Sequence, residues 1–256
     1  DASRRWRIEL ERGTLARRDH RPADALNHLQ AAIEASPSDL DSTDLNAMRL
    51  TTADLHLSLE NSQAAVDVLQ AVTPDELSPG DRRAYWSLQG RSLVRFNDDK
   101  ALEALRRAYE AGTRRPDVLR PLARLAYREG DSRLAWRVYT DLLHTGFEPS
   151  LEDRLYAGIL AYYEENDPIQ AVDYLRPALE MLPVDALPAE TLLMAHETMV
   201  GCLRDTQAPP EELTDVVASW IDLLVAKKDL DALVELIDRV IEMELDRPRI
   251  FGLLEA

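Results

Sequence analysis

The stretch AYREGDSRLAWRVYTDLLHTGFEP (residues 126–149) decides the fold that we predict for this chain. A Gly-Asp turn at 130–131 separates two segments with helical spacing of apolar residues, and a proline follows the second segment. Ala135, Tyr139 and Leu142 are spaced so that they lie on one face of a helix. The small residue lets a neighbouring helix approach closely, while the larger ones fill the space between the helices. The stretch therefore predicts a helical hairpin.

The same pattern recurs in four other segments, 21–37, 62–72, 98–112 and 166–183. The leading alanines stand at positions 25, 65, 101, 135 and 171, at intervals of 40, 36, 34 and 36 residues. Such a period indicates stacked units, each of which buries its apolar face against its neighbours. Short polar turns precede these helices at 18–22, 96–99, 129–131 and 165–168. In these turns we expect Gly or Asn to supply a positive φ and Asp to cap the second helix.

On these residues the chain resembles the tetratricopeptide repeat (TPR) family, whose unit is a helical hairpin of about 34 residues. The family's small residue inside the first helix matches Gly13, Gly90 and Ala123 and lies near Ala53 and Gly158. Its large residue near the start of that helix matches Trp86, Leu119 and Leu155. The five leading alanines match its small residue opening the second helix. The resemblance implies an all-α fold, a right-handed α-solenoid of about six to seven TPR-like hairpins.

We expect residues 1–256 to form a single superhelical domain, with clear repeats in 1–183 and degenerate repeats in 184–256. The loop 74–81 is longer than the family uses, and Pro177 lies inside a second helix, which it should bend. Three amphipathic helices are predicted at 188–205, 209–228 and 230–244, and their phase in the repeat stays open. Residues 247–256 begin a helix that stops, so we expect the chain to be a fragment of a longer one.

The net charge of −17 is distributed unevenly along the chain. Residues 1–137 contain 22 basic and 22 acidic side chains, whereas residues 138–256 contain 8 basic and 25 acidic ones. A negative field repels nucleic acid and anionic membranes, so we expect neither nucleic-acid binding nor membrane insertion of this segment. The acidic half provides solubility or a surface for a basic protein or a cationic polymer. A cytoplasmic or bacterial periplasmic location fits this composition, in which Cys202 is the only cysteine.

Candidate chemical motifs are weak, so we expect no enzyme, no metal site and no cofactor. The five histidines, at positions 20, 28, 56, 144 and 196, never stand four residues apart. His196-Glu197 has the start of a zinc-protease motif, but Val200 occupies the position of the second ligand. Glycine-rich phosphate loops are absent from the sequence. Cys202 lies on an apolar helix face, which favours a buried structural thiol.

The resemblance also implies a binding groove, because the first helices of TPR arrays line a concave surface. Transferred to this sequence, the groove residues are Arg91, Arg95, Arg120, Arg124, Tyr127, Arg128, Tyr156 and Tyr163, with Glu164 beside them and Arg7, Thr14, Arg17 and Arg18 facing the same way in the first repeat. Arginine presents a planar fork that suits carboxylates, and tyrosine adds apolar area with a polar tip. These residue types indicate a groove for an acidic or C-terminal peptide segment. The alternative is that the arginines pair with acids on adjacent helices.

These observations favour a non-catalytic scaffold that mediates protein–protein interaction by holding a partner peptide or helix in its groove. A first alternative is a periplasmic TPR scaffold of a bacterial exopolysaccharide secretion machine, which recruits a polymer-modifying enzyme or guides a cationic polymer. A second alternative is a regulatory module that binds a small ligand.

Overall fold

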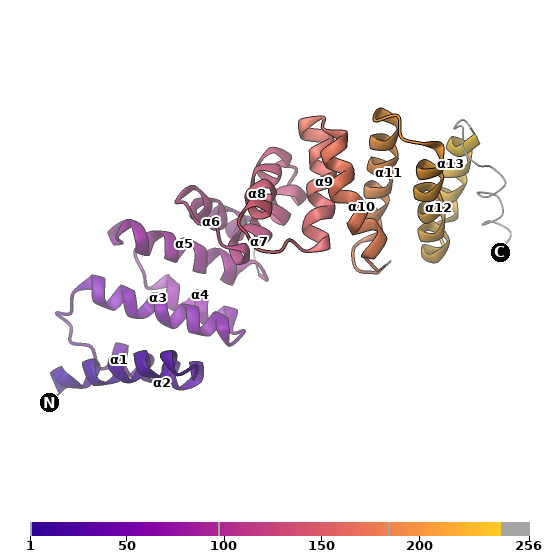
Figure 1. Cartoon of the computed structure of the whole chain (residues 1–256). Coiled ribbons are helices and arrows are strands. Elements are labelled where there is room, and N and C mark those ends of the chain that lie inside the picture. Colours follow the sequence, from indigo (N-terminus) through magenta and orange to yellow (C-terminus); the bar gives the residue numbers. More distant parts are fainter. Residues whose placement is uncertain (1, 97, 184, 242–256) are drawn as a thin grey trace. The chain divides into compact units, whose positions relative to one another are not determined.

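The computed structural model describes residues 2–96, 98–183 and 185–241, and this part of the chain is helical and contains no β-strand (Figure 1). Its elements are α1 (Ala2–Arg18), α2 (Pro22–Glu34), α3 (Ser42–Ser58), α4 (Ser62–Gln70), the 3₁₀ helix η1 (Pro74–Glu76), α5 (Pro79–Leu93), α6 (Asp98–Glu110), α7 (Pro116–Arg128), α8 (Ser132–His144), α9 (Leu151–Glu165), α10 (Pro168–Met181), α11 (Ala189–Asp205), α12 (Pro210–Lys227) and α13 (Leu230–Ile241). The predicted all-α solenoid is confirmed.

The helices divide into two compact units, Asp1–Gly130 and Asp131–Ala256. In the first unit, α1 packs on α2, α3 on α4 and α5 on α6, while α3 and α7 both contact α5. In the second unit, α9 packs on α10 and α11 on α12. Consecutive helices therefore form hairpins, and the first helices of neighbouring hairpins lie against each other. The single continuous domain expected from the sequence stays a prediction.

The repeat pattern forms the core of each hairpin. Its five leading alanines have no exposed surface: Ala25, Ala65, Ala101, Ala135 and Ala171. The larger residue that follows each alanine is also buried, with 2% exposure or less: Leu29, Leu69, Leu105, Tyr139 and Leu175. A methyl group added at Gly90 or Gly158 would lie 2.5 Å from Cγ of Leu105 or Leu175. At these two positions glycine is therefore required where the first helix crosses the second.

Two of the predicted turns form as expected. Gly130 has φ +80° and Asn166 has φ +53°, and Asp131 and Asp167 cap the helices that follow by accepting backbone N–H bonds. The turn 18–22 differs, because His20 takes the positive φ of 56° and Arg21 occupies the N-cap position without a side-chain bond. Histidine tolerates a positive φ better than most residues, which explains how it can stand where Gly or Asn was expected. The turn 96–99 includes residue 97, which lies outside the described part.

The long loop at 74–81 is ordered by one arginine. After η1, Arg82 donates hydrogen bonds to the carbonyl oxygens of Pro74 (3.1 Å), Asp75 (3.1 Å) and Leu77 (3.2 Å). Ser78 then caps α5 by accepting from the N–H of Asp81 at 3.2 Å. The insertion is thus tied to the helix that it precedes, which fixes the start of α5.

The phase of the last helices follows from their contacts. α11 contacts α9 as α5 contacts α3, so α11 is the first helix of a hairpin whose second helix is α12. α13 packs on α12 and follows this hairpin. Pro177 lies inside the second helix α10, as expected, and the bend predicted there stays a prediction. The predicted helix at 247–256 lies outside the described residues.

The buried His56 makes the first unit sensitive to acid. Its side chain is on α3, its residue is only 6% exposed, and its Nδ1 has no hydrogen-bond partner in the described part of the chain. Burial lowers the pKa of His56, and the charge of Asp67 opposes this shift. Because the folded-state pKa lies below the unfolded-state value of about 6.5, the unfolded chain binds the proton first as pH falls.

We therefore expect the free energy of unfolding to decrease as pH falls below about 6.5. Urea unfolding at a series of pH values measures this slope. His56→Gln should flatten it, because the residue that replaces the buried histidine does not titrate. Equal slopes in wild type and His56→Gln would contradict the assignment to His56.

Candidate functional site

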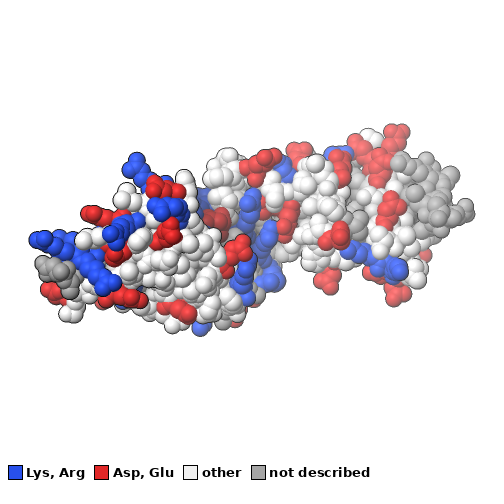
Figure 2. All heavy atoms as spheres, turned by 90° about the horizontal axis from the view of Figure 1, so that it is seen from below, with Lys and Arg blue, Asp and Glu red and all other residues white. Residues whose placement is uncertain are grey.

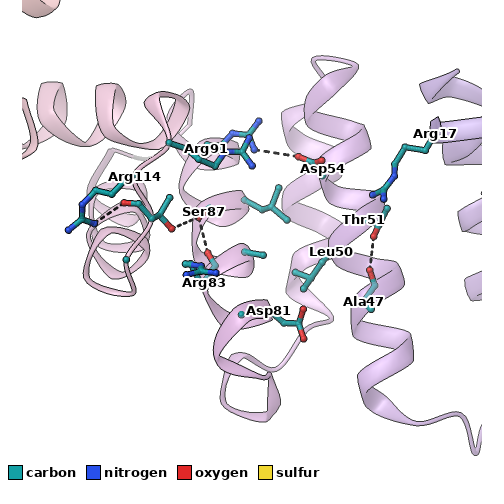
Figure 3. Close-up of a pocket in the computed structure, with 16 residues that line it drawn as sticks. Arg17, Ala47, Leu50, Thr51, Asp54, Asp81, Arg83, Ser87, Arg91 and Arg114 are labelled. Atoms are coloured by element: carbon teal, nitrogen blue, oxygen red, sulfur yellow. Dashed lines mark hydrogen bonds and ion pairs between the residues drawn. The ribbon is translucent and has the colours of Figure 1, made fainter. Parts of the chain in front are cut away.

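The first unit contains a groove of about 560 Å³ on its first helices. The groove is lined from α1, α3, α5 and the loop between α6 and α7, and Figure 3 shows its labelled side chains. Apolar residues, among them Leu50 and Leu88, form part of its wall, and Ser87 lies 3.3 Å from the hydroxyl of Thr113. The helices that the resemblance assigned to the concave surface thus line a groove.

Positive charge predominates in this groove. Five arginines and two aspartates line it: Arg17, Arg83, Arg91, Arg114, Arg115, Asp54 and Asp81. The face of the molecule in Figure 2 carries both basic and acidic side chains, whereas arginine outnumbers aspartate in the lining of the groove. A ligand with several carboxylates would find complementary charge here.

Three of the arginines have partners within the protein. The Arg91 guanidinium lies 3.4 Å from the Asp54 carboxylate and 3.1 Å from that of Asp117. Arg115 forms two bonds with Asp117, at 3.0 and 2.8 Å. Arg114 donates to the carbonyl oxygen of Tyr109 at 2.8 Å and lies over its ring. Internal pairing, the alternative considered for the arginines, is therefore correct for Arg91.

Arg17 and Arg83 differ from these three. Neither makes an ion pair or a side-chain hydrogen bond with the residues that the structure describes. In Figure 3, Arg17 comes from α1 and Arg83 from α5, with α3 between them. The two guanidinium groups are available to a ligand from the two sides of the groove.

Two smaller cavities share residues with the groove. One, of about 150 Å³, lies between α1 and α3 and includes Arg17, Leu10 and Met48. The other, of about 280 Å³, includes Arg91 and Arg95. Because Arg17 and Arg91 are shared, the two smaller cavities adjoin the groove.

The structure distributes the predicted groove residues over several places. Arg91 lines the groove and Arg95 the adjoining cavity. On α7, Arg124 and Arg128 are exposed, while Arg120 and Tyr127 are half-buried, and these four side chains have interactions of their own. In the second unit, the rings of Tyr156 and Tyr139 stack with centroids 5.9 Å apart, and Tyr163 is 57% exposed.

Sequence reasoning missed Arg83, Arg114 and Arg115. Helical spacing could have predicted Arg83, because it stands eight residues before Arg91 and therefore on the same face of α5. Arg114 and Arg115 lie in a loop, where helical spacing gives no information.

The candidate metal, thiol and membrane features of the sequence can be compared with the described residues. No group of three or more His, Cys, Asp or Glu side chains there could hold a metal ion. Burial raises the pKa of Cys202 to about 12, so its fully buried thiol stays protonated, as expected for a structural cysteine. Within the described ranges, none of the helices combines the length and apolar character needed to span a membrane.

Comparison with known proteins identifies the fold. No protein-family model matches the chain, and no curated protein matches it. A solved tetratricopeptide repeat protein from Parabacteroides merdae superimposes with a TM-score of 0.54 at 13% identity, over 98% of both chains. The C-terminal part of a TPR repeat-containing protein from Cytophaga hutchinsonii gives 0.51 at 14% identity, over 89% of this chain and 87% of that one. MamA protein gives 0.50 at 18% identity, over 69% and 91%. The chain therefore has the tetratricopeptide-repeat fold.

Proposed function

We propose that the protein is a non-catalytic scaffold that binds an acidic peptide segment of a partner protein in the groove of its first unit. One observation carries the proposal: five arginines line this groove against two aspartates, and Arg17 and Arg83 make no ion pair within the described chain. Both side chains are exposed, so each can form charge-assisted, bidentate hydrogen bonds with a carboxylate that an acidic peptide supplies.

The shape of the groove supports an extended peptide rather than a compact ligand. The cavities at Arg17 and Arg91 adjoin the groove, and apolar side chains such as Leu10 and Leu50 line it and the cavity at Arg17 beside the charged ones. A segment that alternates acidic and apolar residues would satisfy both kinds of surface. Arg91 and Arg115, already held by Asp54 and Asp117, would form a rigid edge.

The test uses a fluorescently labelled peptide of alternating glutamate and alanine, with a free or an amidated C-terminus. We expect saturable binding to the wild-type chain, weakened roughly tenfold or more in Arg17→Glu/Arg83→Glu because like charges then face each other. The matched control Arg4→Glu/Arg5→Glu makes the same charge change on exposed arginines of α1 outside the groove.

Equal weakening by the two double variants would show that only net charge matters, and it would contradict the groove as the site. Absence of saturable binding to the wild type would contradict acidic-peptide recognition. A loss of binding on amidation alone would identify the terminal carboxylate as the recognised group.

A further inference from the structure

The second unit contains a small cavity that the peptide groove does not involve. It has a volume of about 150 Å³ and lies on three consecutive helices, α10, α11 and α12. His196 and Met199 of α11 are buried at its base, with 5% and 1% of their surface exposed. The cavity is thus a depression with a buried floor.

The histidine at the base is neutral. Its Nδ1 lies 2.8 Å from the carbonyl oxygen of Leu192, which can only accept, so Nδ1 carries the proton. Its Nε2 then accepts from the hydroxyl of Ser219 at 3.3 Å. Burial lowers the pKa of His196, so the ring carries no charge near neutral pH. The floor of the cavity therefore adds no positive charge.

The rim of the cavity is acidic. Three carboxylates, Glu180, Glu212 and Asp215, stand against one guanidinium, that of Arg176. Arg176 of α10 forms an ion pair with Glu212 of α12 at 2.9 Å. Glu180 is exposed and makes no ion pair with the described residues. The rim has a formal excess of two negative charges.

The walls between floor and rim are apolar. Leu179 comes from α10 and Val216 from α12, and both are half-buried. An occupant that matches this cavity needs an apolar stem to contact the walls and the Met199 side chain. It also needs a cationic head at the level of the carboxylates. Arginine and lysine side chains have this construction.

We propose that this cavity binds the side chain of an arginine or lysine presented by a basic segment of a protein partner. The cavity has room for one unbranched side chain. A cationic sugar polymer fits less well, because its ammonium group is attached directly to a ring that the narrow cavity would have to admit. The proposal is independent of the peptide groove in the first unit, which selects the opposite charge.

The test measures binding of a labelled peptide of alternating arginine and alanine to the complete chain by fluorescence anisotropy. We expect saturable binding that Glu180→Lys weakens by about tenfold or more, because it places a like charge at the rim. The matched control Glu235→Lys, at an exposed position of α13, should change the affinity by less than about twofold. Both substitutions are at exposed positions, and thermal unfolding verifies that both variants fold.

Two further arms separate this site from general attraction to an acidic protein. The NMR signals of the His196 ring, assigned with His196→Gln, should shift when the peptide binds. Unchanged His196 signals at saturation, or equal weakening by Glu180→Lys and Glu235→Lys, would overturn the proposal. Tighter binding of a glucosamine oligomer than of the arginine peptide, with the same dependence on Glu180, would overturn the assignment to a protein side chain.

Discussion

Gly90→Ala is expected to lower the free energy of unfolding of the first unit by about 2 kcal/mol. The new methyl group would lie 2.5 Å from Cγ of Leu105 and 3.0 Å from its backbone nitrogen. Neither atom is the end of a flexible side chain, so α6 must move away from α5 to admit it. The loss of contacts in the fully buried core around Leu105 exceeds the gain in helix propensity that alanine brings.

The matched control for this prediction is Gly80→Ala, in the first turn of the same helix. The nearest atom to a methyl group there is Ser78 Oγ at 3.9 Å, so only the propensity gain of about 0.5–1 kcal/mol remains and stability should rise. Urea unfolding followed by circular dichroism measures both variants. In addition, Gly90→Ala/Leu105→Ala should cost less than the sum of its single variants, because the leucine Cγ is then absent. A Gly90→Ala protein as stable as Gly80→Ala would show that α5 and α6 can accommodate the methyl group without loss of contacts.

The distance from an added methyl group to the facing leucine also predicts how strongly alanine would destabilise the other repeats. The added methyl group would lie 2.5 Å from Leu175 at Gly158 but 3.0 Å from Leu29 at Gly13. The repeat pattern found in the sequence includes these pairs, because a small residue in the first helix and a larger one in the second are both set by helical spacing. Such local relations are the part of the fold that one sequence predicts well.

Relations between hairpins were not accessible in the same way. Arg91 pairs with Asp54, which precedes it by 37 residues, and this contact depends on how one hairpin stacks on the next. Spacing along a helix places Arg91 on a face but does not reveal which acid stands opposite. The predicted groove residues therefore included both a paired arginine and residues of α7 with other contacts, while Arg83 was missed.

Turn residues show a second limit of sequence reasoning. His20 and Glu60 adopt positive φ, at 56° and 58°, although neither is Gly or Asn. The packed helices on both sides fix these turns, so the fold imposes a backbone conformation that the local sequence does not favour. The helices themselves were predicted correctly, because the same helical spacing of apolar residues recurs in five segments of the sequence.

Tyr139→Ala is expected to have the largest effect on the second unit. Tyr139 occupies the position that leucine holds in the other four repeats, and it has no exposed surface. Its ring stacks on that of Tyr156 in α9, with centroids 5.9 Å apart and planes inclined by 14°. Truncation removes this contact and leaves a cavity between α8 and α9, at a cost of about 3–4 kcal/mol.

Tyr139→Leu restores the residue usual at this position and should recover most of the loss, leaving about 1 kcal/mol for the missing ring contact. The matched control Tyr163→Ala removes a ring that is 57% exposed and should cost less than about 1 kcal/mol. Hydrogen exchange of α8 and α9 measures the effect where it arises, because each repeat contacts mainly its neighbours. Equal loss of protection in Tyr139→Leu and Tyr139→Ala would mean that the stacked tyrosine pair, and not the filled volume, holds α8 and α9 together.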